Sequence, residues 1–324
     1  MKATLKKIVS AKEFTLFVIM VLGVIVFRTM NKNFTSLDNT RNIFNSAFIV
    51  GTLAVGMSCL LISGKLDLST ANTGMMAGVL IALLLKTGMP WGIALVIVLA
   101  FGAVTGLINA FFVNVLNFTA FISTLGVSAV YGGLALVLTN AQNVAIGNKS
   151  FWTLGSMNVF NTFPLPFVIM VVLLAIYGIM LSMTRFGRRI YMVGGNPNSA
   201  RLAGINPKKL TTLLFVNNSV IASLVGVVLA SRMHMGSPLA LAGNDLDAIT
   251  AAVLGGVSFT GGSGNMFGAF LGIMILTGFQ NGIVVVELDS YYRVVAKGVL
   301  LIVALALDFY REKARTKTRT RLPD

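Results

Sequence analysis

Three aspartates mark the places where polar chemistry could occur within an otherwise apolar chain. Asp67, Asp245 and Asp247 stand in glycine-containing breaks between long apolar runs. A carboxylate near a membrane is costly unless it is paired or hydrated, and the ends of broken helices can hold a polar solute near the midplane. An aspartate ahead of an apolar run is also a good helix N-cap. Both roles are open, and capping is favoured for each residue taken alone.

Amide side chains form a second set of polar groups in or at the ends of the apolar runs. They are Asn72, Asn109, Asn114, Asn217, Asn218, Gln280 and Asn281. A neutral amide offers donors and acceptors without a charge, which suits an uncharged polyol better than an ion. Hydrogen bonding between helices is an equal alternative for any one of them. The candidate pathway residues from these two patterns are Asp67, Ser69, Asn72, Asn109, Asn217, Asp247 and Asn281.

A polar island, Thr184–Leu210, separates two long apolar runs and carries six basic residues and no acidic one. Asn196-Pro197 is typical of an N-cap followed by proline at the first helical position. We therefore expect a short helix from Pro197 to Ala203, ended by Gly204 in the left-handed conformation. Any cytoplasmic loop collects positive charge, but a capped helix inside the loop favours a docking element.

Composition places most of the chain in lipid. Hydrophobic residues make up 56% and charged residues only 11%, with a mean hydropathy of +0.86, whereas soluble domains carry about 25% charged residues. The net charge of +15 is concentrated, because 16 of the 25 basic residues lie in the first 12 residues, the island and the stretch 311–321. This distribution is typical of cytoplasmic loops and termini, and it argues against nucleic-acid binding. A basic tail, 311–324, is expected on the cytoplasmic side.

The sequence lacks the motifs of the common enzyme and nucleotide-binding classes. It has no phosphate-binding loop of the G-x-x-x-x-G-K-[S/T] type, no G-x-S-x-G elbow and no H-E-x-x-H pair. One cysteine and one histidine exclude an internal disulfide and predict no metal site. We therefore expect no enzyme activity and no cofactor, and any energy for transport must come from a separate subunit.

Apolar windows of about 20 residues define the elements that position these groups. Spans are expected at 14–29, 43–63, from the stretch 64–74 to 85, and at 91–113, 118–138, 164–183, 210–233, 266–286 and 291–309. The segment 246–257 is too short to cross alone. If both termini and the island are cytoplasmic, each interval needs an even number of spans, so 246–257 must count and the total is ten.

The fold class is therefore an all-α integral membrane protein with about ten transmembrane helices in a single domain, 1–324. A faint echo between Leu66–Thr70 and Leu246–Thr250 favours two inverted repeats of five helices, because the ten-span count puts the two stretches on opposite sides. Four charged residues around the last outer turn are expected to pair there. They are Glu287, Asp289, Arg293 and Lys297.

Four ordered stretches resemble permease subunits of sugar-type ABC importers, the ribose, xylose and arabinose group. They are FGRRIYMVGGNPNSARLAGINPKKL in the island, GKLDLSTANTG at 64–74, FISTLGVSAVYGGLALVLTNAQN at 121–143 and LDAITAAVLGGVSFTGGSGNMFGAFLG at 246–272. The resemblance covers nearly the whole chain. Members of the group usually have glycine and serine soon after Asp-Leu-Ser, where this chain has Thr70-Ala71-Asn72, so the choice of sugar is left open.

The resemblance implies an importer that moves a monosaccharide or related polyol across the inner membrane. It implies a second permease subunit, expected as a homodimer, a cytoplasmic ATPase and an extracytoplasmic sugar-binding protein. Phe121 and Thr124 join the pathway candidates on this basis. The ATPase-docking role would fall on Gly187, Arg188, Gly195, Asn196, Ala200, Arg201, Gly204 and Ile205.

Three other functions stay open at this point. A nucleoside or branched-chain amino acid permease would use a related fold, and an amino acid would need a cation such as Arg232 for its carboxylate. An ion-coupled secondary transporter would need an essential membrane carboxylate and would work without ATP. A membrane enzyme is disfavoured by the missing nucleophile and metal ligands.

Overall fold

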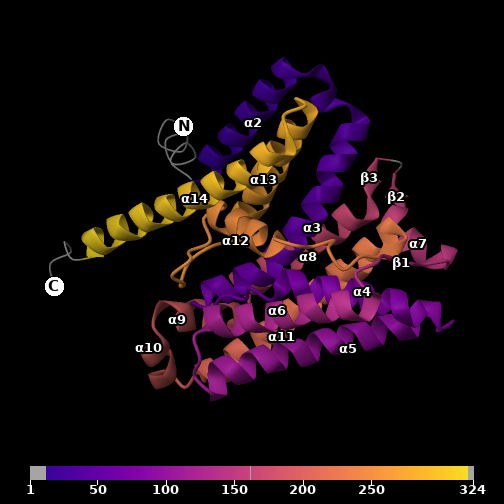
Figure 1. Ribbon diagram of the computed structural model, residues 1–324. Helices are drawn as coiled ribbons and strands as arrows, with labels where there is room; N and C mark the ends of the chain where they lie inside the picture. Colours follow the sequence, from indigo (N-terminus) through magenta and orange to yellow (C-terminus); the bar gives the residue numbers. More distant parts are fainter. Residues whose placement is uncertain (1–11, 161, 320–324) are drawn as a thin grey trace.

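The protein is almost entirely helical over residues 12–160 and 162–319, which the computed structural model describes (Figure 1). Most of the basic N-terminal group, residues 1–11, and the end of the expected tail, 320–324, lie outside the described residues. The rest of the tail continues the last helix without a break. The expectation of an all-α architecture is therefore confirmed.

The first half of the chain runs back and forth in long helices. Its elements are α2 (Lys12–Met30), the 3₁₀ turn η1 (Lys32–Thr35), α3 (Leu37–Ile62), α4 (Thr70–Lys86), α5 (Trp91–Ala110), the π turn η2 (Phe111–Val115) and α6 (Ala120–Thr139). Local capping fixes where they begin. The Ser36 hydroxyl accepts a hydrogen bond from the backbone N–H of Asn39 to start α3, and Pro90 precedes α5.

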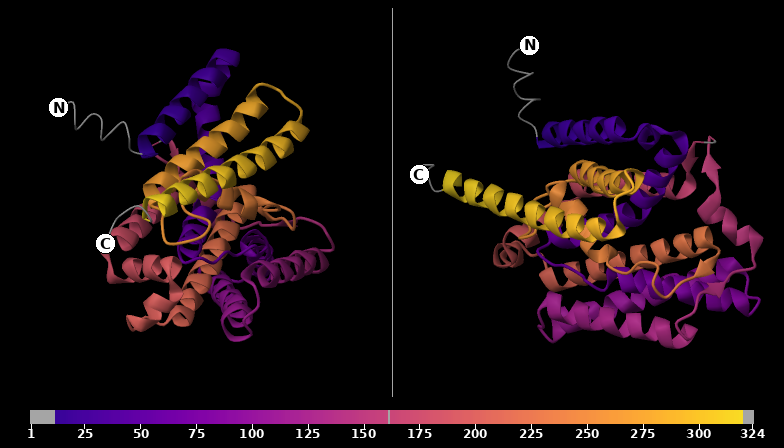
Figure 2. Two further views of the ribbon diagram at one scale, coloured as in Figure 1. Left: turned by 90° about the vertical axis from the view of Figure 1, so that its left-hand side faces the viewer. Right: turned by 45° about the horizontal axis from the view of Figure 1, so that its top comes forward.

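The middle of the chain contains short elements at both ends of the molecule, joined by the long helix α8 (Leu165–Met183). The short elements are β1 (Val144–Ala145), α7 (Lys149–Ser156), β2 (Asn158–Val159), β3 (Phe163–Pro164), α9 (Arg185–Gly195) and α10 (Pro197–Leu202). Strands β2 and β3 form an antiparallel hairpin. In Figures 1 and 2 this hairpin and α7 lie at the opposite end of the molecule from α9 and α10.

The second half begins with the longest buried helix and contains one interrupted segment. Its elements are α11 (Pro207–Met233), β4 (Met235–Gly236), α12 (Asn244–Leu254), α13 (Met266–Val285) and α14 (Ser290–Arg319). Strand β4 pairs antiparallel with β1, with Val144 opposite Gly236. Helix α12 has only 11 residues, so the expectation of a segment too short to cross alone is confirmed.

Helices α3 and α11 form the centre of the molecule, and most of their residues are buried. Helices α4 and α5 pack against α11, whereas α12 and α13 pack against α3. Glycines let the backbones approach closely. A Cβ on Gly226 would lie 1.7 Å from the carbonyl oxygen of Gly74, and a Cβ on Gly272 would lie 2.1 Å from that of Ala251.

Seven of the described helices are long and apolar enough to cross a membrane. Helix α4 and the apolar part of α14, Val294–Ala306, are shorter. With α12 also short, a count of ten crossings is not confirmed by length and hydropathy. Helices α4 and α5 of the first half pack on α11 of the second half, and α12 and α13 of the second half pack on α3 of the first. Inverted repeats would give such a pattern, and they stay a prediction.

The first and last described helices both have an end on the side of α9. The Asn265 amide, just before α13, donates 2.9 Å to the Glu13 carboxylate near the start of α2. Asp308, late in α14, accepts 2.9 Å from the backbone N–H of Phe259. Both contacts involve the loop from Gly255 to Asn265, and that loop also contacts α9.

Candidate functional site

The polar island folds as two short helices. The Thr184 hydroxyl caps α9 by accepting 3.0 Å from the backbone N–H of Gly187. Helix α9 buries Ile190 and Val193 and exposes Arg188. The expectation of a single short helix in the island was therefore incomplete. Apolar residues at 186, 190 and 193 share one helical face, and this spacing is the signal in the sequence that predicts α9.

Helix α10 follows after one intervening residue. The Asn196 side chain accepts hydrogen bonds from the backbone N–H groups of Asn198 (3.0 Å) and Ser199 (3.1 Å), and Pro197 occupies the first helical position. Gly204 adopts a φ of +79°, and Asn206 caps α11 through the N–H of Lys209. The expected caps and the short helix are confirmed, with the helix ending at Leu202, one residue early.

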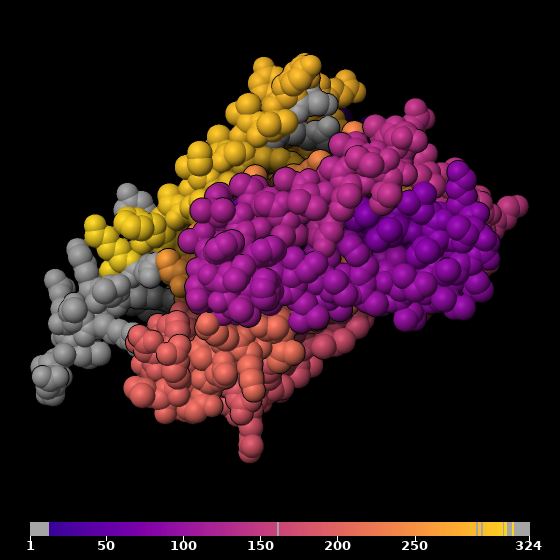
Figure 3. Space-filling view, turned by 60° about the horizontal axis from the view of Figure 1, so that its bottom comes forward, coloured from indigo at the N-terminus to yellow at the C-terminus, as the bar shows by residue number. Residues whose placement is uncertain are grey.

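The outer surface of α9 and α10 is basic and also exposes two large apolar residues, Met192 and Leu202. Arg188 and Arg201 are exposed, and Leu202 is 91% exposed. Beside them lies a groove of about 390 Å³ lined by Arg201, Gly204, Ile205, Asn206, Pro207 and Lys208. In the space-filling view the residues near 190–205 lie exposed at the lower left (Figure 3). Leu202 was missed from the sequence, although a leucine directly after an arginine in a polar loop is a visible signal.

The other docking candidates have structural surroundings of different kinds. Gly195, Asn196 and Gly204 are exposed, and Ile205 is half-buried. Gly187 and Ala200 are buried. Both pack beneath the exposed surface. A Cβ on Gly187 would lie 2.4 Å from the carbonyl oxygens of Met180 and Leu181 at the end of α8.

The inner side of α9 is fixed to both halves of the protein. A Cβ on Gly194 would lie 1.7 Å from the Ile62 carbonyl oxygen and 2.7 Å from the Gly262 nitrogen. The Tyr191 hydroxyl donates 2.7 Å to the carbonyl oxygen of Gly264, and burial raises the pKa of this tyrosine, which keeps it neutral. We call Gly194, Ile62 and Gly262 the glycine junction.

A buried polar cluster fills the break between α3 and α4. The Asp67 carboxylate accepts from the backbone N–H (2.9 Å) and hydroxyl (2.6 Å) of Ser69, from Asn109 (3.2 Å) and from Asn218 (3.0 Å). Asp67, Ser69, Asn109 and Asn218 have no exposed surface. Thr124 reaches the same region, since its hydroxyl accepts 2.9 Å from the N–H of Leu68. The cluster joins α4, α5, α6 and α11.

Neither role that the sequence left open for Asp67 is found in this conformation. Its carboxylate accepts from the backbone N–H of Ser69, which is itself the N-cap residue of α4, and the side chain of that residue does not cap the helix. The Asp67 carboxylate is also fully enclosed by protein donors, so no solute contacts it here. Asn218, which completes the enclosure, was among the amides noted in the sequence but not among the pathway residues.

A second polar cluster lies at the beginning of α12. Asp247, 3% exposed, forms an ion pair of 2.5 Å with Lys297 of α14 and accepts 3.3 Å from Gln280 of α13. The expectation that Lys297 pairs within the last outer turn was wrong, because Asp247 is its partner. An unpaired carboxylate costs more free energy when it is buried than when it is exposed to water, so Lys297 stabilises the protein more by pairing with Asp247 than by pairing in the exposed turn.

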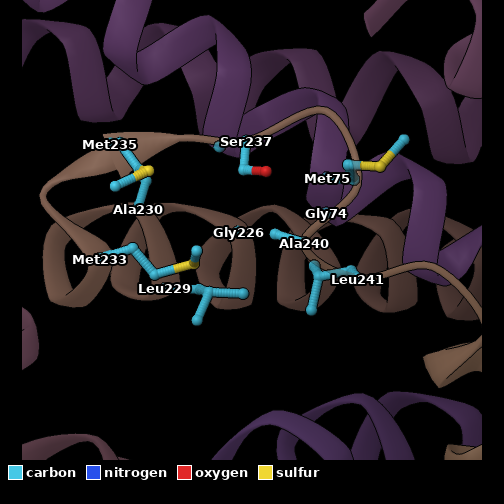
Figure 4. A pocket seen from close by; sticks show the side chains of 11 residues that line it. Gly74, Met75, Gly226, Leu229, Ala230, Met233, Met235, Ser237, Ala240 and Leu241 are labelled. Atoms are coloured by element: carbon cyan, nitrogen blue, oxygen red, sulfur yellow. The ribbon is translucent and has the colours of Figure 1, made fainter. Parts of the chain in front are cut away.

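The chain reaches α12 by descending between α4 and α11. After β4, a Cβ on Gly236 would lie 2.6 Å from the Gly78 carbonyl oxygen, and Leu241 lies against Gly74. Figure 4 shows Met235, Ser237 and Leu241 of this segment around the same small cavity as Met75, Leu229 and Met233. The cavity measures only about 10 Å³, so the segment packs closely against α4 and α11 in this conformation.

The remaining pathway candidates do not join either cluster. The Asn72 amide donates 2.9 Å to the Ser128 carbonyl oxygen of α6. Asn217 accepts a hydrogen bond from the Tyr177 hydroxyl, and Asn281 exchanges two hydrogen bonds with Asn39. Phe121 is 54% exposed on the side of α6. The structure thus gathers three of the other eight candidates, Ser69, Asn109 and Thr124, around Asp67, places Asp247 in the second cluster and leaves the remaining four apart.

A polar cavity of about 300 Å³ lies at the opposite end of α3 and α11 from α9. It is lined by Asp38, Arg41, Asn42, Asn45, Gly155, Ser156, Asn158, Pro164 and Arg232. Over residues 12–160 and 162–319, no group of three potential metal ligands of the His, Cys, Asp or Glu type comes together.

Comparison with known proteins agrees with this arrangement. A family model described as "Branched-chain amino acid transport system / permease component" matches residues 39–305. The chain is 33% identical over 319 residues to "Probable ABC transporter permease protein YphD" of Escherichia coli (strain K12), covering 98% of this chain and 96% of that relative.

Two further relatives carry a sugar in their names. The chain is 32% identical over 283 residues to "L-arabinose transport system permease protein AraH" of Escherichia coli (strain K12), covering 87% and 86% of the two chains. It is 31% identical over 286 residues to "Ribose import permease protein RbsC" of Bacillus subtilis (strain 168), covering 88% and 89%. No solved structure gives a significant match to the chain.

Proposed function

Since the chain belongs to this family of permease components, we propose that it is the membrane-spanning subunit of an ATP-driven importer for a monosaccharide or related polyol. It is a multi-pass protein of the inner membrane, and its relatives are transport proteins and not enzymes. Its partners are of two general kinds, an ATPase and a solute-binding protein.

The observation that carries the proposal is the exposed surface of α9 and α10. Leu202 is 91% exposed on a short helix that is held at both ends, and covering such an apolar side chain with a partner removes apolar area from water. Arg201 precedes it and Arg188 is exposed on α9, and both would pair with carboxylates of the ATPase. The adjoining groove of about 390 Å³ offers a complementary recess.

The inner side of α9 supports a mechanism for passing motion into the membrane. The glycine junction joins α9 to the end of α3 and to the loop before α13, which are parts of both halves. Closure of two ATPases would move α9, and its contacts would carry that motion to the helices behind Asp67 and Asp247. The permease would then alternate between outward-open and inward-open states.

We propose that the solute passes along the surfaces that these two polar clusters expose when the helices separate. Amide and hydroxyl groups dominate the Asp67 cluster, and they match the hydroxyls of a sugar without requiring a net charge. In the present conformation the donors and acceptors bind one another. Ser69, Asn72, Asn109, Phe121, Thr124, Asn217 and Asn281 stay candidates for the open states.

The start of α2 and the later part of α14 lie on the same side of the molecule as α9, which supports the topology proposed from the sequence. Ten crossings would place both termini, α9 and α10 in the cytoplasm, in agreement with Glu13 and Asp308 both contacting the loop beside α9. The exposed apolar faces of α5 and α6 leave room for lipid and for a second copy of the permease, so a homodimer remains our proposal. The solute-binding protein would approach the opposite face.

Charge reversal on the docking surface tests this function. We would purify the tagged permease with its cognate ATPase, comparing wild type with Arg188→Glu/Arg201→Glu and with Lys86→Glu/Lys149→Glu, exposed lysines at the other end of the molecule. We expect only the arginine reversal to release the ATPase while inserting normally. Uptake that continues after ATP depletion, with no ATPase ever retained, would instead indicate a secondary transporter.

A further inference from the structure

The cavity at the end opposite α9 is built from a polar stripe on a membrane helix. Asp38, Arg41, Asn42 and Asn45 lie at positions i, i+3, i+4 and i+7 of α3, which places them on one helical face. A face of this kind is costly against lipid. All four line the cavity of about 300 Å³, a volume at the lower end of the range for small-molecule sites, about 300–1,000 Å³.

The facing wall is held in place by interlocking contacts. The backbone N–H of Gly155 donates 2.9 Å to the Ser231 hydroxyl, which donates 2.6 Å to the carbonyl oxygen of Phe151. A Cβ on Gly155 would lie 2.3 Å from the Arg232 nitrogen, so α7 is seated against the end of α11. Asn158 belongs to the hairpin, opposite Pro164. The wall that faces α3 is therefore formed by α7, the hairpin and the end of α11, which contact one another or are paired.

Two guanidinium groups from different helices enter this cavity. Arg41 pairs with Asp38 at 3.3 Å, and the Asp38 side chain is 90% exposed. Arg232 is half-buried, and its side chain has no hydrogen bond or ion pair with any residue in the described parts of the chain. A cation in the last turn of a helix also complements the helix dipole. The helix dipole of α11 explains the position of Arg232. It does not explain why Arg41 of α3 lines the same cavity.

We propose that this cavity binds a monosaccharide that carries a carboxylate, such as a hexuronate. The guanidinium of Arg232 would bind the carboxylate through charge-assisted hydrogen bonds, with Arg41 as the second cation. The amides of Asn42, Asn45 and Asn158 and the Ser156 hydroxyl supply donors and acceptors for sugar hydroxyls. The inference rests on the proposed importer function and deepens it by naming an anionic sugar as the solute class.

Binding to the purified permease–ATPase complex in nanodiscs, without nucleotide, tests the proposal. The probes are D-galacturonate and D-galactose, which differ at C6 by a carboxylate in place of CH₂OH. We expect galacturonate to bind wild type, galactose to bind much more weakly, and Arg232→Gln to weaken galacturonate roughly 10- to 100-fold. Arg41→Gln should weaken it less, since Asp38 shares that cation. Lys149→Gln, exposed beyond the cavity, is the matched control.

Two results would overturn the proposal. One is equal binding of both sugars, or galacturonate binding that Arg232→Gln leaves unchanged. The other is no binding of free galacturonate together with weaker capture of the solute-binding protein by Arg232→Gln, which would assign the cavity to an acidic side chain of that protein. Retention of the ATPase by every variant verifies folding. ATP-dependent uptake of a neutral sugar by wild type separately tests the importer function.

Discussion

The carbonyl oxygen of Ile62 accepts a hydrogen bond of 2.8 Å from the backbone N–H of Gly262, and Gly194 packs directly against this bond. Ile62 ends α3 in the first half of the chain, and Gly262 lies in the loop before α13 in the second half. The two halves and α9 therefore meet at a contact between backbones, where any added side chain must displace something.

Gly194→Ala should uncouple ATP hydrolysis from transport. The new Cβ would lie 1.7 Å from the Ile62 carbonyl oxygen, closer than atoms can approach, so α9 must shift while its outer surface stays intact. We expect ATPase capture to persist and solute uptake to fall at least about tenfold, the effect of misplacing a coupled element by a fraction of an ångström. Uptake and ATP hydrolysis are measured on the same proteoliposomes. Gly92→Ala, with open space around its Cβ, is the control, and equal uptake by both variants would contradict the role of the junction.

Leu202→Asp should weaken ATPase binding without affecting insertion. The side chain is 91% exposed and contributes little to the fold, whereas loss of an apolar interface anchor costs about 2 kcal/mol or more, roughly 30-fold in affinity. Titration of labelled ATPase onto the permease in nanodiscs measures this affinity. Phe160→Asp, which removes a side chain of similar exposure (88%) at the other end of the molecule, should leave the affinity unchanged. If both variants bind equally well, Leu202 is no anchor.

Asp67→Ala should destabilise the protein strongly. The amides of Asn109 and Asn218 and the Ser69 hydroxyl would lose a buried acceptor, and breaking a buried network of this kind costs about 3 kcal/mol. Thermal unfolding in detergent would show a lower midpoint. Asp67→Asn, of nearly equal volume, should lose less. An Asp67→Ala variant that keeps the wild-type midpoint would show that the carboxylate does not stabilise the fold.

The ion pair of Asp247 and Lys297 should behave as a coupled unit. Lys297→Met leaves Asp247, which is 3% exposed, with Gln280 as its one remaining side-chain partner among the described residues, so we expect a greater loss of stability than in the double variant Asp247→Asn/Lys297→Met. The four proteins of this cycle are compared by their unfolding midpoints. Additive effects of the two single changes would show that the pair is not coupled.

Local signals in the sequence were sufficient to predict most of the helices and caps. Asn196-Pro197 and Gly204 predicted α10 because capping and a left-handed turn depend on neighbouring residues only. Runs of apolar residues predicted nearly all the long helices for the same reason. Helix α9 was missed because its basic residues concealed a regular apolar face.

The partners of the polar side chains could not be predicted in the same way. Asp67 and Asn218 are separated by 151 positions, and their meeting depends on how α4 packs on α11. Asp247 was noted as a carboxylate in a break between apolar runs, yet Lys297 was expected to pair elsewhere because the packing of α14 on α12 has no local signature. Residue types marked the polar positions, but their grouping into clusters depends on the tertiary structure.

Asn196 ends α9 and begins α10, and it is the one residue between them. Its backbone N–H donates to α9 at Met192, while its side chain accepts from α10. Because Asn196 bonds to both helices, no flexible loop separates α9 from α10. A rotation of α10 at Leu202 would therefore rotate α9 at Gly194 in the same sense, since no intervening segment could absorb the movement.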